Sequence, residues 1–288
     1  MDYAGVVVLE ILYMIAFLAL TSAGLAIVFG MMRVINLAHG EFVMLGGYTT
    51  IACAKAGIDI YFAMLVVAPL VVGVWGLIVE RLIIRFLYGR MIDTMLATWG
   101  LSLLMVGAVT LIFGSSAVSV PAPIPGYQLG SYQMGGYNLF IIAVAILLVL
   151  ALWAVLRFTR AGLIARGAMQ GADVVAALGY NPRKVYMVTF TAGAALSGLA
   201  GGVLAPLTGL LPSSGGAYIA KAFITVITGG AAVISGTLSS SVLFGVINQL
   251  TSFGAGPVIG EIAMLVLAVV LLRLMPQGIT GRFFRNGT

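Results

Sequence analysis

The stretch INLAHGEF, residues 35–42, contains side chains whose chemistry is unexpected in so apolar a chain. It holds the single histidine, His39, with Asn36 before it and Glu41 after it. Imidazole, carboxamide and carboxylate groups can bind a polar solute or carry protons. Because His39 and Glu41 are two residues apart, their side chains diverge by about 200° on a helix, which disfavours a His–Glu proton relay.

Two compatible interpretations of this stretch remain open. One is a polar helix start, in which Asn36 caps the helix, Glu41 lies near the positive end of the helix dipole, and Gly40 permits close helix packing. The other is the lining of a solute path, since ionisable groups inside a bilayer usually face a bundle interior or a wet cavity. A metal site is disfavoured, because one histidine without clustered acids or cysteines does not supply three or four ligands.

The composition is that of an integral membrane protein, with 62% apolar residues, 8% charged residues and a mean hydropathy of +1.18. No charged residue occurs in residues 94–156, 185–220 or 222–260, and each of these stretches can hold at least one span of about 20 residues. The first apolar run follows an acid rather than a basic segment, so we expect a retained span rather than a cleaved signal peptide. The single Cys53 excludes an internal disulfide, and we expect it to be a small filler within an apolar run.

The distribution of basic residues predicts the orientation of the chain and argues against nucleic-acid binding despite a net charge of +6. Lys and Arg concentrate on the cytoplasmic side of membrane proteins. The three clusters therefore predict cytoplasmic loops and a cytoplasmic C-terminus. They comprise Arg81, Arg85 and Arg90; Arg157, Arg160, Arg166, Arg183 and Lys184; and Arg273, Arg282 and Arg285. The Gly-, Pro- and Tyr-rich residues 114–138 are then an external loop.

Residues 217–250 predict a broken membrane segment. A Gly-Gly and a Ser-Gly divide it into pieces of roughly a dozen to fifteen residues, which favours two short crossings or a re-entrant hairpin lining a transport path. The predicted fold is an all-α inner-membrane bundle of eight or nine spans, in one domain over residues 1–288. We predict that six polar residues border the solute path: Asn36, His39, Glu41, Thr225, Thr228 and Asn248.

The segment GLAIVFGMMRVINLAHGEFVMLGGYTT resembles the signature of permease subunits of branched-chain amino acid ABC importers, a family that includes urea and short-chain amide permeases. LATWGLSLL, RAGLIARGAMQGADVVAALGYNPRKV and AFITVITGGAAVISGT resemble further segments of that family, and RFLYGR…LATWGLSLL is most similar to urea-type members. The resemblance implies a multi-pass permease of the bacterial inner membrane. It also implies four partners: a homologous second permease, two ABC ATPases that hold ATP and Mg²⁺, and an extracytoplasmic solute-binding protein.

Residues 157–184 are too polar to span and are predicted to form a cytoplasmic coupling loop. Helix formers extend over residues 165–178, and Gly179 with Asn181-Pro182 predicts the helix end. The resemblance implies that a short helix from Ala172 to Gly179 docks into the ATPase. Val174, Val175 and Leu178 would form its apolar stripe, with Arg183 and Lys184 at the polar rim. A basic loop that touches lipid headgroups is the alternative.

No catalytic residue and no cofactor of its own are expected in this chain. None of the three lysines, Lys55, Lys184 and Lys221, lies in a Walker A motif, and no serine elbow, HExxH or CxxC motif occurs. Two other functions remain open. A proton-driven secondary transporter would use titratable groups such as Glu10, Glu41, Glu261 and His39, and a passive channel would conduct a small neutral solute.

Overall fold

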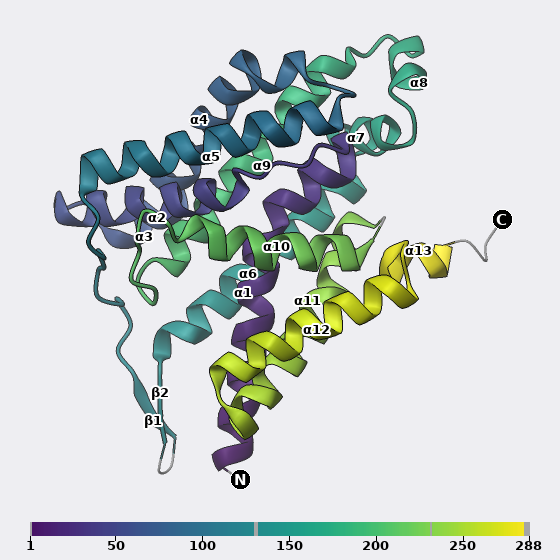
Figure 1. Ribbon diagram of the computed structural model, residues 1–288. Helices are drawn as coiled ribbons and strands as arrows, with labels where there is room; N and C mark the ends of the chain where they lie inside the picture. Colours follow the sequence, from purple (N-terminus) through teal and green to yellow (C-terminus); the bar gives the residue numbers. More distant parts are fainter. Residues whose placement is uncertain (1, 130–131, 231, 285–288) are drawn as a thin grey trace. The chain divides into compact units, whose positions relative to one another are not determined.

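The computed structural model describes residues 2–129, 132–230 and 232–284, and these residues are mostly helical, as predicted (Figure 1). The longer helices are α1 (Asp2–Met32), α2 (His39–Lys55), α4 (Ala68–Leu82), α5 (Met91–Phe113), α6 (Gly136–Phe158), α7 (Arg160–Gln170), α9 (Pro182–Leu204), α10 (Gly215–Gly229), α11 (Val233–Ala255) and α12 (Pro257–Leu274). The shorter helices are α3 (Ile60–Phe62), η1 (Ala63–Val67), η2 (Ile84–Phe86), α8 (Ala172–Ala177) and α13 (Gly278–Phe284).

Seven helical segments within the described residues are long and apolar enough to cross a membrane. They are Ala4–Met32, Ile60–Phe86, Met91–Phe113, Gly136–Phe158, Pro182–Leu204, Val233–Ala255 and Pro257–Gly281. The second of these joins α3, η1, α4 and η2. Helices α2 and α10, with 17 and 15 residues, are shorter, so a count of eight or nine spans depends on whether they cross the membrane.

The chain forms two compact units, and α1, α6 and α10 contribute residues to both. One unit comprises Ala23–Pro121 and Leu150–Ala220. Helices α2, α4 and α9 pack together at its centre around Phe42, Val72 and Phe190. Glycines permit this packing, since a Cβ at Gly46 of α2 would lie 2.3 Å from the carbonyl oxygen of Gly198 in α9.

The other unit comprises Met1–Ser22, Ala122–Val149 and Lys221–Thr288, and within it α11 and α12 lie side by side (Figure 1). Thr280 of α13 bonds both to the end of α10 and to the residue before α11. Its hydroxyl donates to the carbonyl oxygen of Gly229 at 2.6 Å and accepts from the Ala232 amide at 3.2 Å. Gly230, between α10 and α11, has a φ of +85°, a conformation that glycine adopts without steric cost.

The structure corrects one sequence prediction and adds detail to another. The piece after the Gly-Gly break is the 23-residue helix α11, long enough to span, because the helix continues through Ser235 and Gly236. Gly236 instead provides a close approach, since a Cβ there would lie 2.6 Å from the Gly229 carbonyl oxygen. In the predicted loop of residues 114–138, β1 (Tyr127–Leu129) and β2 (Tyr132–Met134) form an antiparallel hairpin.

Candidate substrate path and coupling loop

Asn36 organises the turn that precedes α2. Its side-chain oxygen accepts from the Ala38 amide at 3.0 Å, and the neighbouring Leu37 amide donates to the hydroxyl of Thr98 in α5 at 3.0 Å. The N-cap of α2 is Ala38, which has no side-chain capping bond, so the prediction that Asn36 itself caps the helix is wrong. Asn36 is 2% exposed, and its bond to the Ala38 amide stabilises the turn that precedes α2.

His39 and Glu41 are buried and face different helices, in agreement with their predicted divergence. His39 Nδ1 lies 3.2 Å from the hydroxyl of Ser197 in α9, and Ser197 also donates to the Gly193 carbonyl oxygen at 2.9 Å. The Glu41 carboxylate forms a hydrogen bond with Ser102 of α5, yet its Oε2 atom has no hydrogen-bond partner although Glu41 is only 3% exposed. A buried carboxylate oxygen without a donor is costly, which makes Glu41 the strongest ligand-facing candidate in this stretch.

Gly40 and Gly215 bring the start of α10 against the start of α2. A Cβ at Gly40 would lie 1.9 Å from the Gly215 carbonyl oxygen, and a Cβ at Gly215 would lie 2.7 Å from the Glu41 carboxylate carbon. The two glycines therefore place backbone next to Glu41 where any larger residue would clash. Glu41 in the first turn of α2 and the close packing proposed for Gly40 are thus both present, whereas the Asn36 cap is not.

Thr225, Thr228 and Asn248 belong to the other unit and are 0%, 1% and 5% exposed. The Thr225 hydroxyl donates to the Lys221 carbonyl oxygen within α10, a bond local to the helix. Thr228 Oγ1 and Asn248 Nδ2 have no hydrogen-bond partner. These two atoms suit a polar path, and a common path for all six residues stays a prediction.

The charged pair between α10 and α12 was not predicted from the sequence. Lys221 Nζ lies 2.6 Å from Glu261 Oε1, and 5.6 Å from the centroid of the Phe17 ring in α1. Glu10 of α1 similarly accepts a hydrogen bond of 3.1 Å from the Asn138 amide of α6. The signal for the first pair was present, because Lys221 is the single charge in residues 185–260 and therefore needed a partner.

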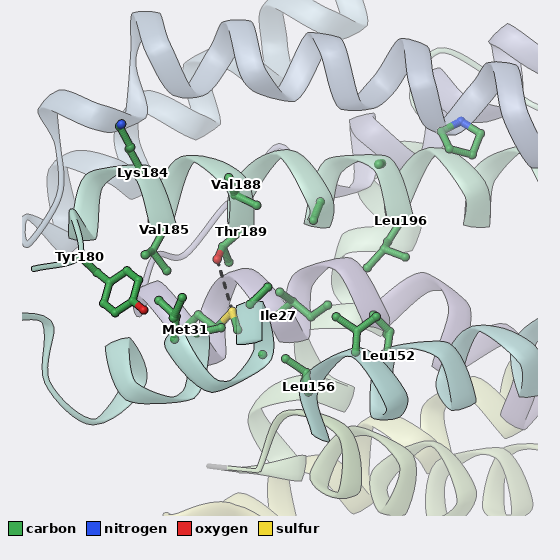
Figure 2. Close-up of a pocket in the computed structure, with 18 of the residues that line it drawn as sticks. Ile27, Met31, Leu152, Leu156, Tyr180, Lys184, Val185, Val188, Thr189 and Leu196 are labelled. Carbon is green, nitrogen blue, oxygen red and sulfur yellow. Dashed lines mark hydrogen bonds between the residues drawn. The ribbon is translucent and has the colours of Figure 1, made fainter. Parts of the chain in front are cut away.

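A cavity of about 610 Å³ lies between α9 and parts of α1, α6 and α7 (Figure 2). Figure 2 shows Ile27 and Met31 facing Val185 and Thr189 across it, and the Thr189 hydroxyl donates to Met31 Sδ at 3.4 Å. The lining is mostly apolar, with Tyr180, Asn181, Lys184 and Thr189 as its polar members. The six predicted path residues lie elsewhere.

The coupling loop folds into two short helices rather than one. Gly171, in an extended conformation, separates α7 from α8, where a continuous helix over residues 165–178 was predicted. Gly179, with φ +86°, follows α8 as predicted. Asn181 then caps α9 by accepting from the Arg183 amide at 3.0 Å, with Pro182 in the first turn.

The apolar residues of the predicted docking stripe differ in exposure. Val175 is 3% exposed, and its Cγ2 atom would lie 3.2 Å from a Cβ added to Gly167 of α7. Val175 therefore packs within the loop. Leu178 is 71% exposed, and Arg183 and Lys184 are exposed as well. The side chain of Val174 lies outside the described part. Of the two stripe side chains that the structure describes, Leu178 is therefore the one available to a partner.

These features define a polytopic α-helical membrane protein of the transporter type, with buried polar groups between its helices and a folded polar loop between α6 and α9. Residues 7–275 match the family described as "Branched-chain amino acid transport system / permease component", and the chain belongs to this family of ABC-type permeases. Members of this family are transporter components rather than enzymes.

Several relatives are similar over most of this chain. The high-affinity branched-chain amino acid transport permease LivH of Escherichia coli K12 is 28% identical over 92% of this chain and 91% of its own length. BraD of Pseudomonas aeruginosa is also 28% identical, over 92% of this chain and 91% of its own. A probable LivH of Methanocaldococcus jannaschii is 27% identical over 92% and 88%. No solved structure matches the chain.

Proposed function

We propose that this chain is the permease subunit of a binding-protein-dependent ABC importer that moves branched-chain amino acids across the bacterial inner membrane. The observation that carries the proposal is the family match over residues 7–275, together with relatives named for branched-chain amino acid transport. A zwitterionic solute needs polar partners along an apolar bundle. The unpartnered Glu41 Oε2 and the unpartnered Asn248 Nδ2 support such a role for the predicted path residues.

The proposed assembly contains four partner subunits of three kinds: a homologous second permease, two ATPases that bind ATP and Mg²⁺, and a solute-binding protein outside the cell. ATP binding and hydrolysis would shift the permease pair between outward-open and inward-open arrangements. The C-terminus and the loop of residues 157–184 would lie in the cytoplasm, in agreement with their basic residues. Docking to an ATPase would use Leu178, with Arg183 and Lys184 at the polar rim and Val175 holding α8 onto α7.

The test is uptake in proteoliposomes that contain this chain, the second permease, both ATPases and a solute-loaded binding protein. Labelled leucine should accumulate only with internal ATP, and uptake should continue after an ionophore collapses the proton gradient. Unlabelled urea and acetamide, the solutes of the alternative permease class, should not reduce the uptake of labelled leucine. Strong uptake by this chain alone would overturn the proposal and favour the secondary transporter or the passive channel.

A further inference from the structure

A small basic pocket lies where α4 and η2 meet the start of α9. It has a volume of about 180 Å³, and its lining is Glu80, Arg81, Arg85, Arg183, Lys184 and Met187. All of these residues belong to one compact unit. Four basic side chains against one carboxylate make the pocket strongly positive, although the basic residues come from segments a hundred residues apart.

Within the described part of the chain, the basic side chains of this pocket form no ion pair with a carboxylate. The ion pairs among the described residues involve other basic residues, Arg90 and Lys221. Arg81 instead reaches the sulfur of Met187 at 3.7 Å, and Figure 2 shows Lys184 pointing away from Val185 and Tyr180 on the opposite side of α9. Like charges held together in a partly apolar site repel one another, and an anion relieves that repulsion.

The one carboxylate of the pocket is already engaged. Glu80 is 3% exposed and accepts a hydrogen bond from the hydroxyl of Tyr88. Burial, together with this bond to the carboxylate, raises the pKa of Tyr88 above its usual range, so Tyr88 remains a donor at neutral pH. Glu80 is thus held by Tyr88, and the four cations are left for an outside anion.

The position of the pocket identifies the source of the anion. The span Ile60–Phe86 ends and the span Pro182–Leu204 begins at this level, so the pocket lies at the membrane boundary, where lipid headgroups are. Leu82 and Phe86 flank the arginines and are 69% and 66% exposed, and the Arg85 guanidinium lies 5.0 Å from the Phe86 ring centroid. An acyl chain fits these apolar side chains, whereas a soluble phosphate gains nothing from them.

We propose that this pocket binds the phosphate of an anionic phospholipid, with Arg81 and Arg85 on one side and Arg183 and Lys184 on the other. Guanidinium groups bind phosphate oxygens through paired N–H donors, and basic pockets between membrane helices are suited to anionic headgroups. The acyl chains run along Leu82 and Phe86. The site adds a lipid requirement to solute transport, and it shares Arg183 and Lys184 with the polar rim proposed for ATPase docking.

The test titrates the purified full chain in neutral detergent with dioleoyl phosphatidylglycerol and counts bound lipid by native mass spectrometry. R81Q/R85Q should weaken lipid binding roughly tenfold, because each basic residue near an anionic headgroup adds to the electrostatic attraction that holds the lipid. R81K/R85K, which keeps both charges, should lose less. The matched control is R157Q/R160Q, which removes two exposed charges outside the pocket, one from the end of α6 and one from the start of α7.

Four results would each overturn the proposal. The control double variant could lose as much lipid as R81Q/R85Q, which would mean general attraction by net charge. Phosphatidylcholine could bind as tightly as phosphatidylglycerol, which would mean that the pocket does not select an anionic headgroup. Soluble glycerol phosphate could compete with the lipid at equal concentration, which would mean a soluble phosphate site. Finally, R81Q/R85Q could keep its lipid and lose ATPase co-purification, which would make the pocket a protein-docking surface.

Discussion

Single polar side chains in this apolar chain are stabilised by specific partners from other helices. His39 contacts Ser197, and Lys221 pairs with Glu261 at 2.6 Å. A charged group in a bilayer is tolerated when it is paired or faces a wet cavity. Glu41 Oε2, Thr228 Oγ1 and Asn248 Nδ2 are among the buried atoms that lack such a partner, in agreement with the proposal that these residues border a solute path.

At this scale we predict that the Lys221–Glu261 pair stabilises the fold only as a pair. K221M and E261M should each lower the free energy of unfolding by roughly 1–3 kcal/mol, because each leaves a charged group without its partner. The double variant K221M/E261M should recover most of that loss. Denaturant unfolding in neutral detergent measures the cycle, with K55M at an exposed helix end as the control. Additive losses would show that the two side chains do not interact.

Helices approach one another through glycine in this chain, and the contacts are too close for any side chain. The α2–α9 pair uses Gly46 and Gly198, and the α2–α10 contact uses Gly40 and Gly215. Van der Waals packing drives helix association in lipid, so close approach is a main source of stability.

We predict that G40A destabilises the protein strongly while G107A does not. The Cβ of G40A would meet the Gly215 carbonyl oxygen, which is backbone and cannot rotate away, at a cost of about 1–3 kcal/mol or more. A Cβ at Gly107 in α5 would meet no atom within 4 Å. Thermal unfolding in detergent compares the two variants. A G40A protein as stable as the parent would show that α2 and α10 do not pack as described.

The coupling loop yields a second prediction at the element scale. L178D should abolish ATPase co-purification while membrane abundance stays normal, because an unpaired carboxylate would be buried in a small contact. L163D is the matched control, since Leu163 of the neighbouring α7 is also exposed, at 64% against 71%. If L178D retains the ATPase and its stimulation by loaded binding protein, docking involves another part of the loop. V175D is unsuitable as a test, because Val175 packs internally.

At the scale of the whole molecule, the six path residues are buried within the isolated chain, so they should become accessible only in the working transporter. We predict that cysteines at Asn36, His39, Glu41, Thr225, Thr228 and Asn248 react with a water-soluble maleimide during ATP turnover, in a background where Cys53 is replaced by serine. L104C and L111C, at exposed apolar positions of α5, are the controls. Labelling equal to these controls in every state would exclude a path along the six residues.

Much of the architecture was predictable from composition, because the bilayer acts on each helix separately and a span needs only length and apolar residues. The long helices, the short α10 and the turn at Gly179 follow from such local patterns. The length of α11 could not be predicted, because a Ser-Gly pair favours a helix break in the sequence. Only the structure shows that Gly236 stays helical and packs against Gly229. Family membership also followed from sequence, since it depends on motifs rather than on packing.

The tertiary structure decided which polar residues meet. Contacts such as His39–Ser197, Lys221–Glu261 and the pocket of Arg81, Arg85, Arg183 and Lys184 join residues from segments distant in sequence. They depend on how each helix is rotated about its axis and how closely its neighbour approaches. Local periodicity cannot fix either quantity in a span that is apolar on all sides. The same reason explains Val175, which the sequence placed in a docking stripe and the fold turned inward against α7.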